Sequence, residues 1–265
     1  MASIIGRLRK LYKLLPPLLL RDVKERYAGS ILGIFWTLLQ PLLFVLLYWL
    51  VFSQILKIRI KTDTGDIPFI AFLLSGLLPW LALQEGVMRG ATSIVEKRHI
   101  IKKVLFPAEL FPLTSVMSAF VQQGISIVVF LTGFFIWKGH VSLLQIVGIT
   151  ALLFLQIIMT AGLSMIFSSL AVYLRDIIQV LTVGFQLVFY LSTILYPMTS
   201  VPKNLRLLIL INPVTTLTEA YHSAILYGQC PEITILIYLI TLTTAVFFGG
   251  MFLFRKLKRG FADVL

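Results

Sequence analysis

The chain has 265 residues, of which 58% are hydrophobic and only 13% charged, and its mean hydropathy is +0.96. A soluble domain carries about 25% charged residues, so this composition excludes a water-soluble globule, and the high hydrophobicity excludes disorder. At about 20 apolar residues per membrane-spanning helix, the chain can hold about six spans and no sizeable soluble domain. We therefore predict an all-α integral membrane protein with a single transmembrane domain over residues 1–265.

The net charge is +12, from 23 basic and 11 acidic residues. In a membrane protein such an excess indicates orientation and contact with anionic membrane lipids, and we predict no nucleic-acid partner. The one cysteine, Cys230, excludes an internal disulfide framework. The three histidines fall in three different loops, so we predict no metal site.

Residues 1–28 are expected to form an amphipathic interface helix and a charged elbow. Apolar and basic side chains alternate with helical spacing, and the apolar face holds Ile4, Ile5, Leu8, Leu11, Tyr12 and Leu15. The opposite face holds Arg7, Arg9, Lys10 and Lys13. Pro16-Pro17 is expected to end this helix. A secretory signal has a compact apolar stretch and a cleavage site instead, so we expect the segment to be retained.

Six hydrophobic runs follow, and each is expected to span the membrane once between residues 31 and 254: 31–56, 68–94, 109–137, 143–170, 178–197 and 232–254. With both termini inside, sixteen basic residues lie in the inner segments and six in the outer ones. The positive-inside rule then predicts six transmembrane helices with both termini cytoplasmic and a cytoplasmic tail over 255–265.

Residues 198–231 are too many for a hairpin turn, yet they remain apolar. Pro202, Pro213 and Pro231 divide them into pieces of about ten and fifteen residues, each too short to span. We favour short re-entrant or interfacial helices before the last span. An ordinary external loop is the alternative.

Motifs for catalysis are missing. The sequence has no Gly-x-x-x-x-Gly-Lys-Ser/Thr phosphate loop, no His-Glu-x-x-His and no Gly-x-Ser-x-Gly. We therefore expect neither an enzyme nor a cofactor in this chain, and active transport would need energy from a partner.

Two charged patterns stand near the expected inner ends of spans. Glu85 and Arg89 share one helix face, either as a stabilising pair at the boundary or at an inner vestibule, and their role stays open. Residues 96–107 mix charges with an apolar stripe that ends at Pro107, which suits a short helix lying on lipid or docked on a cytoplasmic protein. The candidate contacts are Glu96, Lys97, Arg98, His99, Ile100, Lys102 and Lys103, with Arg175 and Asp176 in the other inner turn.

Aromatic and polar residues recur every three or four positions in the first and fifth runs: Trp36, Gln40, Phe44 and Tyr48 in the first, and Phe185, Phe189, Ser192 and Tyr196 in the fifth. The candidate glycan-path residues are these except Ser192. Aromatic faces beside a few polar groups suit sugar rings, although aromatic residues in spans also serve as packing or interface anchors. In the fourth run, Thr160, Ser164 and Ser168 are expected to allow close helix packing.

These segments together resemble the permease subunit of type-2 ABC exporters of polysaccharides, the family that exports O-antigen, teichoic acid and capsule. The resemblance is carried by the sequence RDVKERYAGSILGIFW at 21–36 and its continuation to Leu42, by GLLPW at 76–80, by IKKVLFP at 101–107, and by YPM at 196–198 with Asn212-Pro213. The family implies a second copy of the chain, two cytoplasmic nucleotide-binding ATPase subunits that hold ATP and Mg²⁺, and a lipid-linked polysaccharide as cargo.

In that family the 96–106 segment resembles the coupling helix on the ATPase, and the aromatic residues above would line the glycan path beside a lateral opening at the first and fifth spans. The resemblance implies a multi-pass protein of the bacterial cytoplasmic (inner) membrane. The alternatives are an ABC permease for drugs or small lipids, and a passive channel or assembly scaffold that needs no ATPase.

Overall fold

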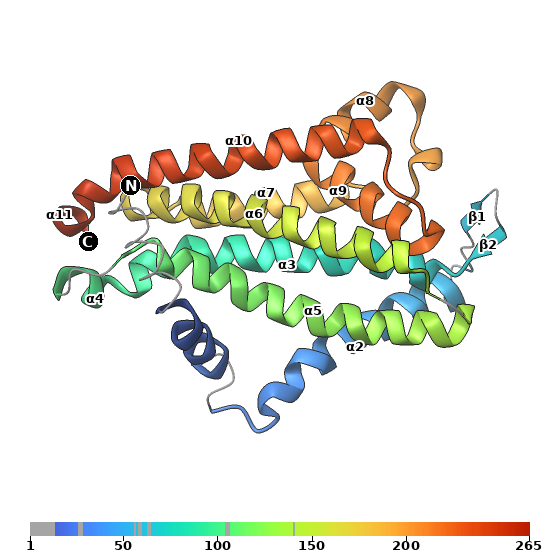
Figure 1. Cartoon of the computed structure of the whole chain (residues 1–265), viewed down its shortest axis with the longest axis horizontal. Coiled ribbons are helices and arrows are strands. Elements are labelled where there is room, and N and C mark those ends of the chain that lie inside the picture. The colour runs from blue at the N-terminus through green and yellow to red at the C-terminus, as the bar shows by residue number, and fades with distance from the viewer. Residues whose placement is uncertain are drawn as a thin grey trace.

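The computed structural model describes residues 14–25, 29–55, 57, 60–62, 65–103, 107–139 and 141–265. Long helices packed side by side make up nearly all of this part of the chain, as the composition predicts (Figure 1). A small antiparallel hairpin, β1 (Ile60–Thr62) and β2 (Gly65–Ile67), departs from the all-α prediction. It lies at the end of the molecule opposite the C-terminus.

Four helices are long and apolar enough to cross a bilayer: α3 (Phe69–Glu96), α5 (Leu110–Lys138), α6 (Leu143–Tyr173) and α10 (Ile233–Leu257). They match the second, third, fourth and sixth predicted runs. Helices α3, α6 and α10 run in one direction and α5 runs in the opposite one, so that α4 (Arg98–Lys103) and α11 (Phe261–Val264) lie at the same end of the molecule. The length and composition of these four helices are those of a multi-pass membrane protein.

The two remaining runs are less regular. The first forms η1 (Gly33–Phe35), α2 (Trp36–Tyr48) and η2 (Trp49–Ile55) without a break. The fifth forms α7 (Ile177–Tyr190), whose 14 residues extend about 21 Å, short of a hydrocarbon core of about 30 Å. The prediction that this helix continues to residue 197 is wrong, because α7 ends at Tyr190.

Polar side chains explain where α7 ends. The amide of Asn212 donates to the carbonyls of Val188 (3.4 Å) and Leu191 (3.2 Å), and the Ser192 hydroxyl donates to the carbonyl of Phe189 (2.8 Å). These bonds satisfy carbonyl groups that the end of a helix leaves without partners. The chain turns at this point instead of continuing as a helix.

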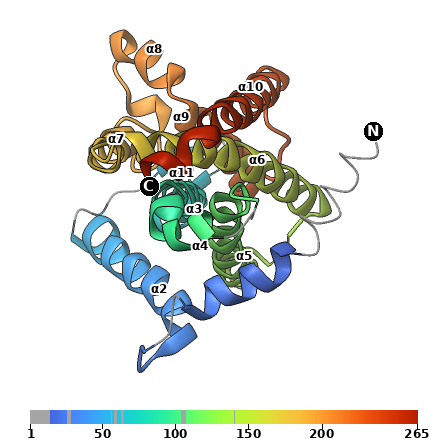
Figure 2. The ribbon, with the colours of Figure 1, turned by 90° about the vertical axis from the view of Figure 1, so that its left-hand side faces the viewer.

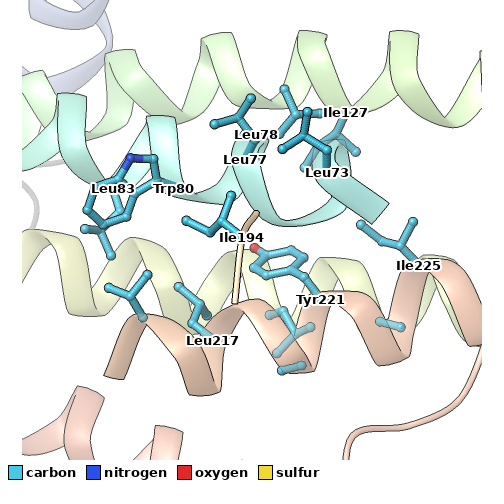
Figure 3. Packing of buried hydrophobic residues seen from close by; sticks show 14 of the residues in the cluster. Leu73, Leu77, Leu78, Trp80, Leu83, Ile127, Ile194, Leu217, Tyr221 and Ile225 are labelled. Carbon is cyan, nitrogen blue, oxygen red and sulfur yellow. The ribbon is translucent and has the colours of Figure 1, made fainter. Parts of the chain in front are cut away.

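Residues 198–231 fold into short helices, as expected: η3 (Met198–Ser200), α8 (Lys203–Ile211), α9 (Pro213–His222) and η4 (Ser223–Tyr227). Most of α9 is buried against α3, α6 and α10. Its Tyr221 hydroxyl donates to Gln156 Oε1 (2.7 Å), and Gln156 Nε2 donates to the carbonyl of Pro79 (2.7 Å). Figure 3 shows Tyr221 in the apolar core with α3 residues such as Leu73 and Leu77.

The N-terminal prediction is corrected in one respect. Residues 14–25 are helical, so Pro16-Pro17 does not end the helix. A proline has no backbone N–H to donate, so the helix passes through these two residues without the hydrogen bonds that their N–H groups would make. The amphipathic face predicted for residues 1–13 lies outside the described residues and stays a prediction.

Small residues allow close helix contacts, as the Thr160, Ser164 and Ser168 repeat predicts. All three are fully buried in α6, and a Cβ atom at Gly86 would lie 2.8 Å from the Thr160 methyl group. The α6–α10 crossing is tighter, because a Cβ atom at Gly162 would lie 2.7 Å from the Phe247 Cα atom.

We expect Gly162→Ala to force α6 and α10 apart and to destabilise the purified protein by about 1–3 kcal/mol, as overpacking does. The measurement is thermal unfolding in detergent. Gly249→Ala is the control, because a Cβ atom there meets nothing within 4 Å. Equal melting temperatures for the two variants would show that this crossing tolerates the extra methyl group.

Candidate functional site

A cavity of about 290 Å³ lies between α2, α3 and α7. The two predicted aromatic stripes meet at this cavity, which is lined by Phe44 and Tyr48 of α2 and by Phe185 and Phe189 of α7. Each pair has a spacing of four residues, which places both rings on one helix face. The structure thus brings four of the seven predicted residues together, and their role stays a prediction.

The wall formed by α3 was not predicted as part of this site. The Trp80 ring packs against Phe185 and Phe189, with centroids 5.5 and 5.8 Å away. Gln84, one turn further along α3, lines the same cavity. The four-residue spacing of an aromatic and an amide, as in Trp36 and Gln40, was the sequence signal that could have found them.

Polar groups complete the lining. The lining residues Gln84 and Gln186 carry amides, and Tyr48, Thr182 and Tyr190 carry hydroxyl groups. Flat aromatic faces bind the C–H edges of a sugar ring, and amides and hydroxyls bond its hydroxyl groups. The lining therefore suits a carbohydrate better than a wholly apolar molecule.

The other three predicted residues do not line the cavity. Trp36 lies at the start of α2 and is exposed, and the side chain of Gln40 lies outside the described part of the chain. Tyr196 follows α7, and its hydroxyl donates to the carbonyl of Tyr190 (2.9 Å). Tyr196 thus supports the backbone of a lining residue.

A larger cavity of about 530 Å³ lies between α2, α3 and α5. Aliphatic and phenylalanine side chains dominate its walls, and the Ser126 hydroxyl donates to the carbonyl of Gln122 (3.1 Å). Such walls offer little to the hydroxyl groups of a sugar and suit hydrocarbon instead. We therefore place the candidate glycan site at the smaller cavity.

The predicted coupling segment corresponds to α4, which begins two residues later than expected. Glu96 is the last residue of α3, Lys97 is a turn and the helix begins at Arg98. Arg98, His99 and Ile100 are exposed, whereas Ile101 packs against the buried cluster around Phe254. The side chains of Lys102 and Lys103 and residues 104–106 lie outside the described residues.

The other predicted contact, Arg175 and Asp176, is exposed in the turn between α6 and α7. Helix α11 contacts both α4 and α6, and the Tyr173 hydroxyl donates to the carbonyl of Leu257 near the end of α10 (2.8 Å). Both candidate contacts therefore belong to one end of the molecule, where Figure 2 shows α4 and α11 facing the viewer.

The Glu85 and Arg89 side chains lie 3.6 Å apart, as their spacing predicts. Arg89 Nη2 also contacts Asp22 Oδ2 at 2.8 Å, from the helix over residues 14–25. Glu25 of the same helix accepts a bond from Lys97 Nζ (3.3 Å). Lys97, predicted to contact an ATPase, thus makes an ion pair within the chain.

The family model for ABC-2 type transporters matches residues 17–226. The chain belongs to the ABC-2 type transporter family. An O-antigen export system permease of Klebsiella pneumoniae is 31% identical over 96% of both chains, and one of Myxococcus xanthus is 28% identical over 98% of this chain and 99% of its own. The polysialic acid transport protein KpsM of Escherichia coli is 25% identical over 90% of this chain and 91% of its own. Like other ABC-2 members, this chain is a transport subunit.

Proposed function

We propose that this chain is the permease subunit of an ATP-driven exporter that moves a lipid-linked polysaccharide, an O-antigen or similar surface glycan, across the bacterial cytoplasmic membrane. The similarity to O-antigen export permeases over nearly the whole chain carries this proposal. The cavity between α2, α3 and α7 supports it, because aromatic rings and amides line it together.

The proposal includes six spans, with both termini cytoplasmic and α8 and α9 dipping into the outer leaflet. A short α7 and a buried α9 are compatible with this arrangement, because Asn212, at the start of α9, donates to carbonyl groups at the end of α7. The α4 end then faces the cytoplasm, where two nucleotide-binding subunits would bind ATP and Mg²⁺.

A second copy of the chain is also part of the proposal. A cavity of about 290 Å³ is at the low end of the roughly 300–1,000 Å³ usual for small-molecule sites. One copy therefore supplies one wall of a glycan path, and a twofold pair would enclose it.

Deleting the gene tests the function. We expect the surface glycan to disappear and its lipid-linked form to accumulate inside the cell, with recovery when the wild-type gene is returned. A deletion strain with normal surface glycan would contradict the proposal, and new sensitivity to a drug in that strain would favour a drug exporter.

A further inference from the structure

We infer that two ion pairs, Asp22–Arg89 and Glu25–Lys97, fasten the helix over residues 14–25 to the end of α3 and transmit motion of α4 to α2. We call these four residues the ion-pair clamp. The inference rests on the proposed function, because the motion is the one that an ATPase would impose on the permease. It also gives Arg89 a role.

The geometry is that of a two-point attachment. Asp22 and Glu25 are three residues apart and share one face of their helix. Arg89 and Lys97 are eight residues apart, about 12 Å along α3. The two contacts, 2.8 and 3.3 Å long, join residues 67 and 72 positions apart in sequence. Two separated contacts fix the orientation of the helix as well as its position.

The Asp22–Arg89 contact is partly buried. The two side chains are 20% and 32% exposed, so solvent and salt screen this pair less than a surface pair. Arg89 Nη1 also lies 3.5 Å from Ser118 Oγ of α5 and 3.6 Å from Glu85. The guanidinium group is thereby held by α3 and α5 while it binds Asp22.

The Glu25–Lys97 contact is more exposed to solvent than the Asp22–Arg89 contact. Hydrogen bonds from Arg21 and then from Lys97 hold the pKa of the Glu25 carboxyl below its ordinary value. The carboxylate is therefore ionised at neutral pH and available to accept the hydrogen bond from Lys97.

The clamp connects the two candidate sites. Lys97 directly precedes α4, and the helix over residues 14–25 precedes α2, which carries Phe44 and Tyr48 to the cavity. Figure 2 shows α2 at one side of the group formed by α3, α5 and α6. A push on α4 moves the end of α3, and through the clamp it moves the helix that leads into α2. A chain of contacts is shown to be a coupling path only when breaking one of the contacts changes the coupling between the two sites.

The test is Asp22→Asn in the full complex of the permease with its ATPase subunit, reconstituted in vesicles. We expect the amount of glycan exported per ATP hydrolysed to fall at least tenfold, within the roughly 5–150-fold range of coupling between sites. ATPase binding is expected to persist, because the outer face of α4 is unchanged. Lys24→Gln, at an exposed position of the same helix, is the control and should keep the wild-type ratio.

A wild-type ratio in Asp22→Asn would overturn the inference. A second measurement does not depend on export. Thermal unfolding of Asp22→Asn, Arg89→Gln and their combination should give non-additive shifts, and additive shifts would also overturn the clamp. If the wild-type complex exports no glycan, the proposed function fails, while the unfolding data still test the clamp.

Discussion

Replacing Arg98, His99 and Ile100 together with alanine is expected to abolish assembly with the ATPase subunit. These three residues are exposed on the described part of α4. Truncating a few central interface residues typically costs about 2 kcal/mol or more, which is about 30-fold in affinity. Insertion into the membrane should be normal, because Ile101 still packs against the buried cluster. The measurement is co-purification of the tagged permease with the ATPase from membranes.

The matched control removes charge at the same end of the molecule. Arg255 and Lys256 are exposed in the last turn of α10, and their alanine variants should co-purify with the ATPase normally. An equal loss of co-purification in the α4 and α10 variants would mean that overall positive charge, not α4, binds the ATPase. Normal co-purification of the α4 variant would refute α4 as the coupling helix.

The second large effect is expected in the cavity. Phe44→Leu with Tyr48→Leu keeps apolar side chains on α2 but removes the flat faces that a sugar ring would contact. An aromatic contact contributes about 0.5–1.5 kcal/mol beyond its buried area, so losing two should lower glycan export about tenfold. ATP hydrolysis should persist, because α4 is untouched. Export and hydrolysis would be measured in the same vesicles.

Phe248→Leu with Phe252→Leu is the matched pair, since these α10 rings have the same spacing and are 62% and 70% exposed. We expect this variant to export glycan at the wild-type rate. Unchanged export in the Phe44 and Tyr48 variant would remove the cavity from the glycan path. A similar loss in both pairs would point to general damage to the membrane domain.

Periodic patterns predicted the elements that depend on local sequence. The four long helices follow from long apolar runs, and the α2 and α7 walls of the cavity follow from aromatic residues spaced by four. Pro202 and Pro213 also predicted where α8 and α9 begin. Pro202 directly precedes α8, and Pro213 is the first residue of α9.

Contacts between distant residues were not predictable in this way. The end of α7 depends on Asn212, which lies 21 positions after Leu191, and no pattern within the fifth run reveals it. Asp22, which contacts Arg89, is 67 positions away in a helix that was expected to end earlier. Trp80 and Gln84 have the same four-residue spacing as Trp36 and Gln40, but only packing shows that this face of α3 lines the cavity with α2 and α7.

Reconstitution of the purified chain in vesicles tests the central claim most directly. The chain would be supplied with lipid-linked glycan and ATP, with and without the ATPase subunit. We expect glycan to cross only when both the ATPase subunit and ATP are present. Glycan transport by the chain alone, or ATP hydrolysis by the chain alone, would contradict the account of a permease that is driven by its partner.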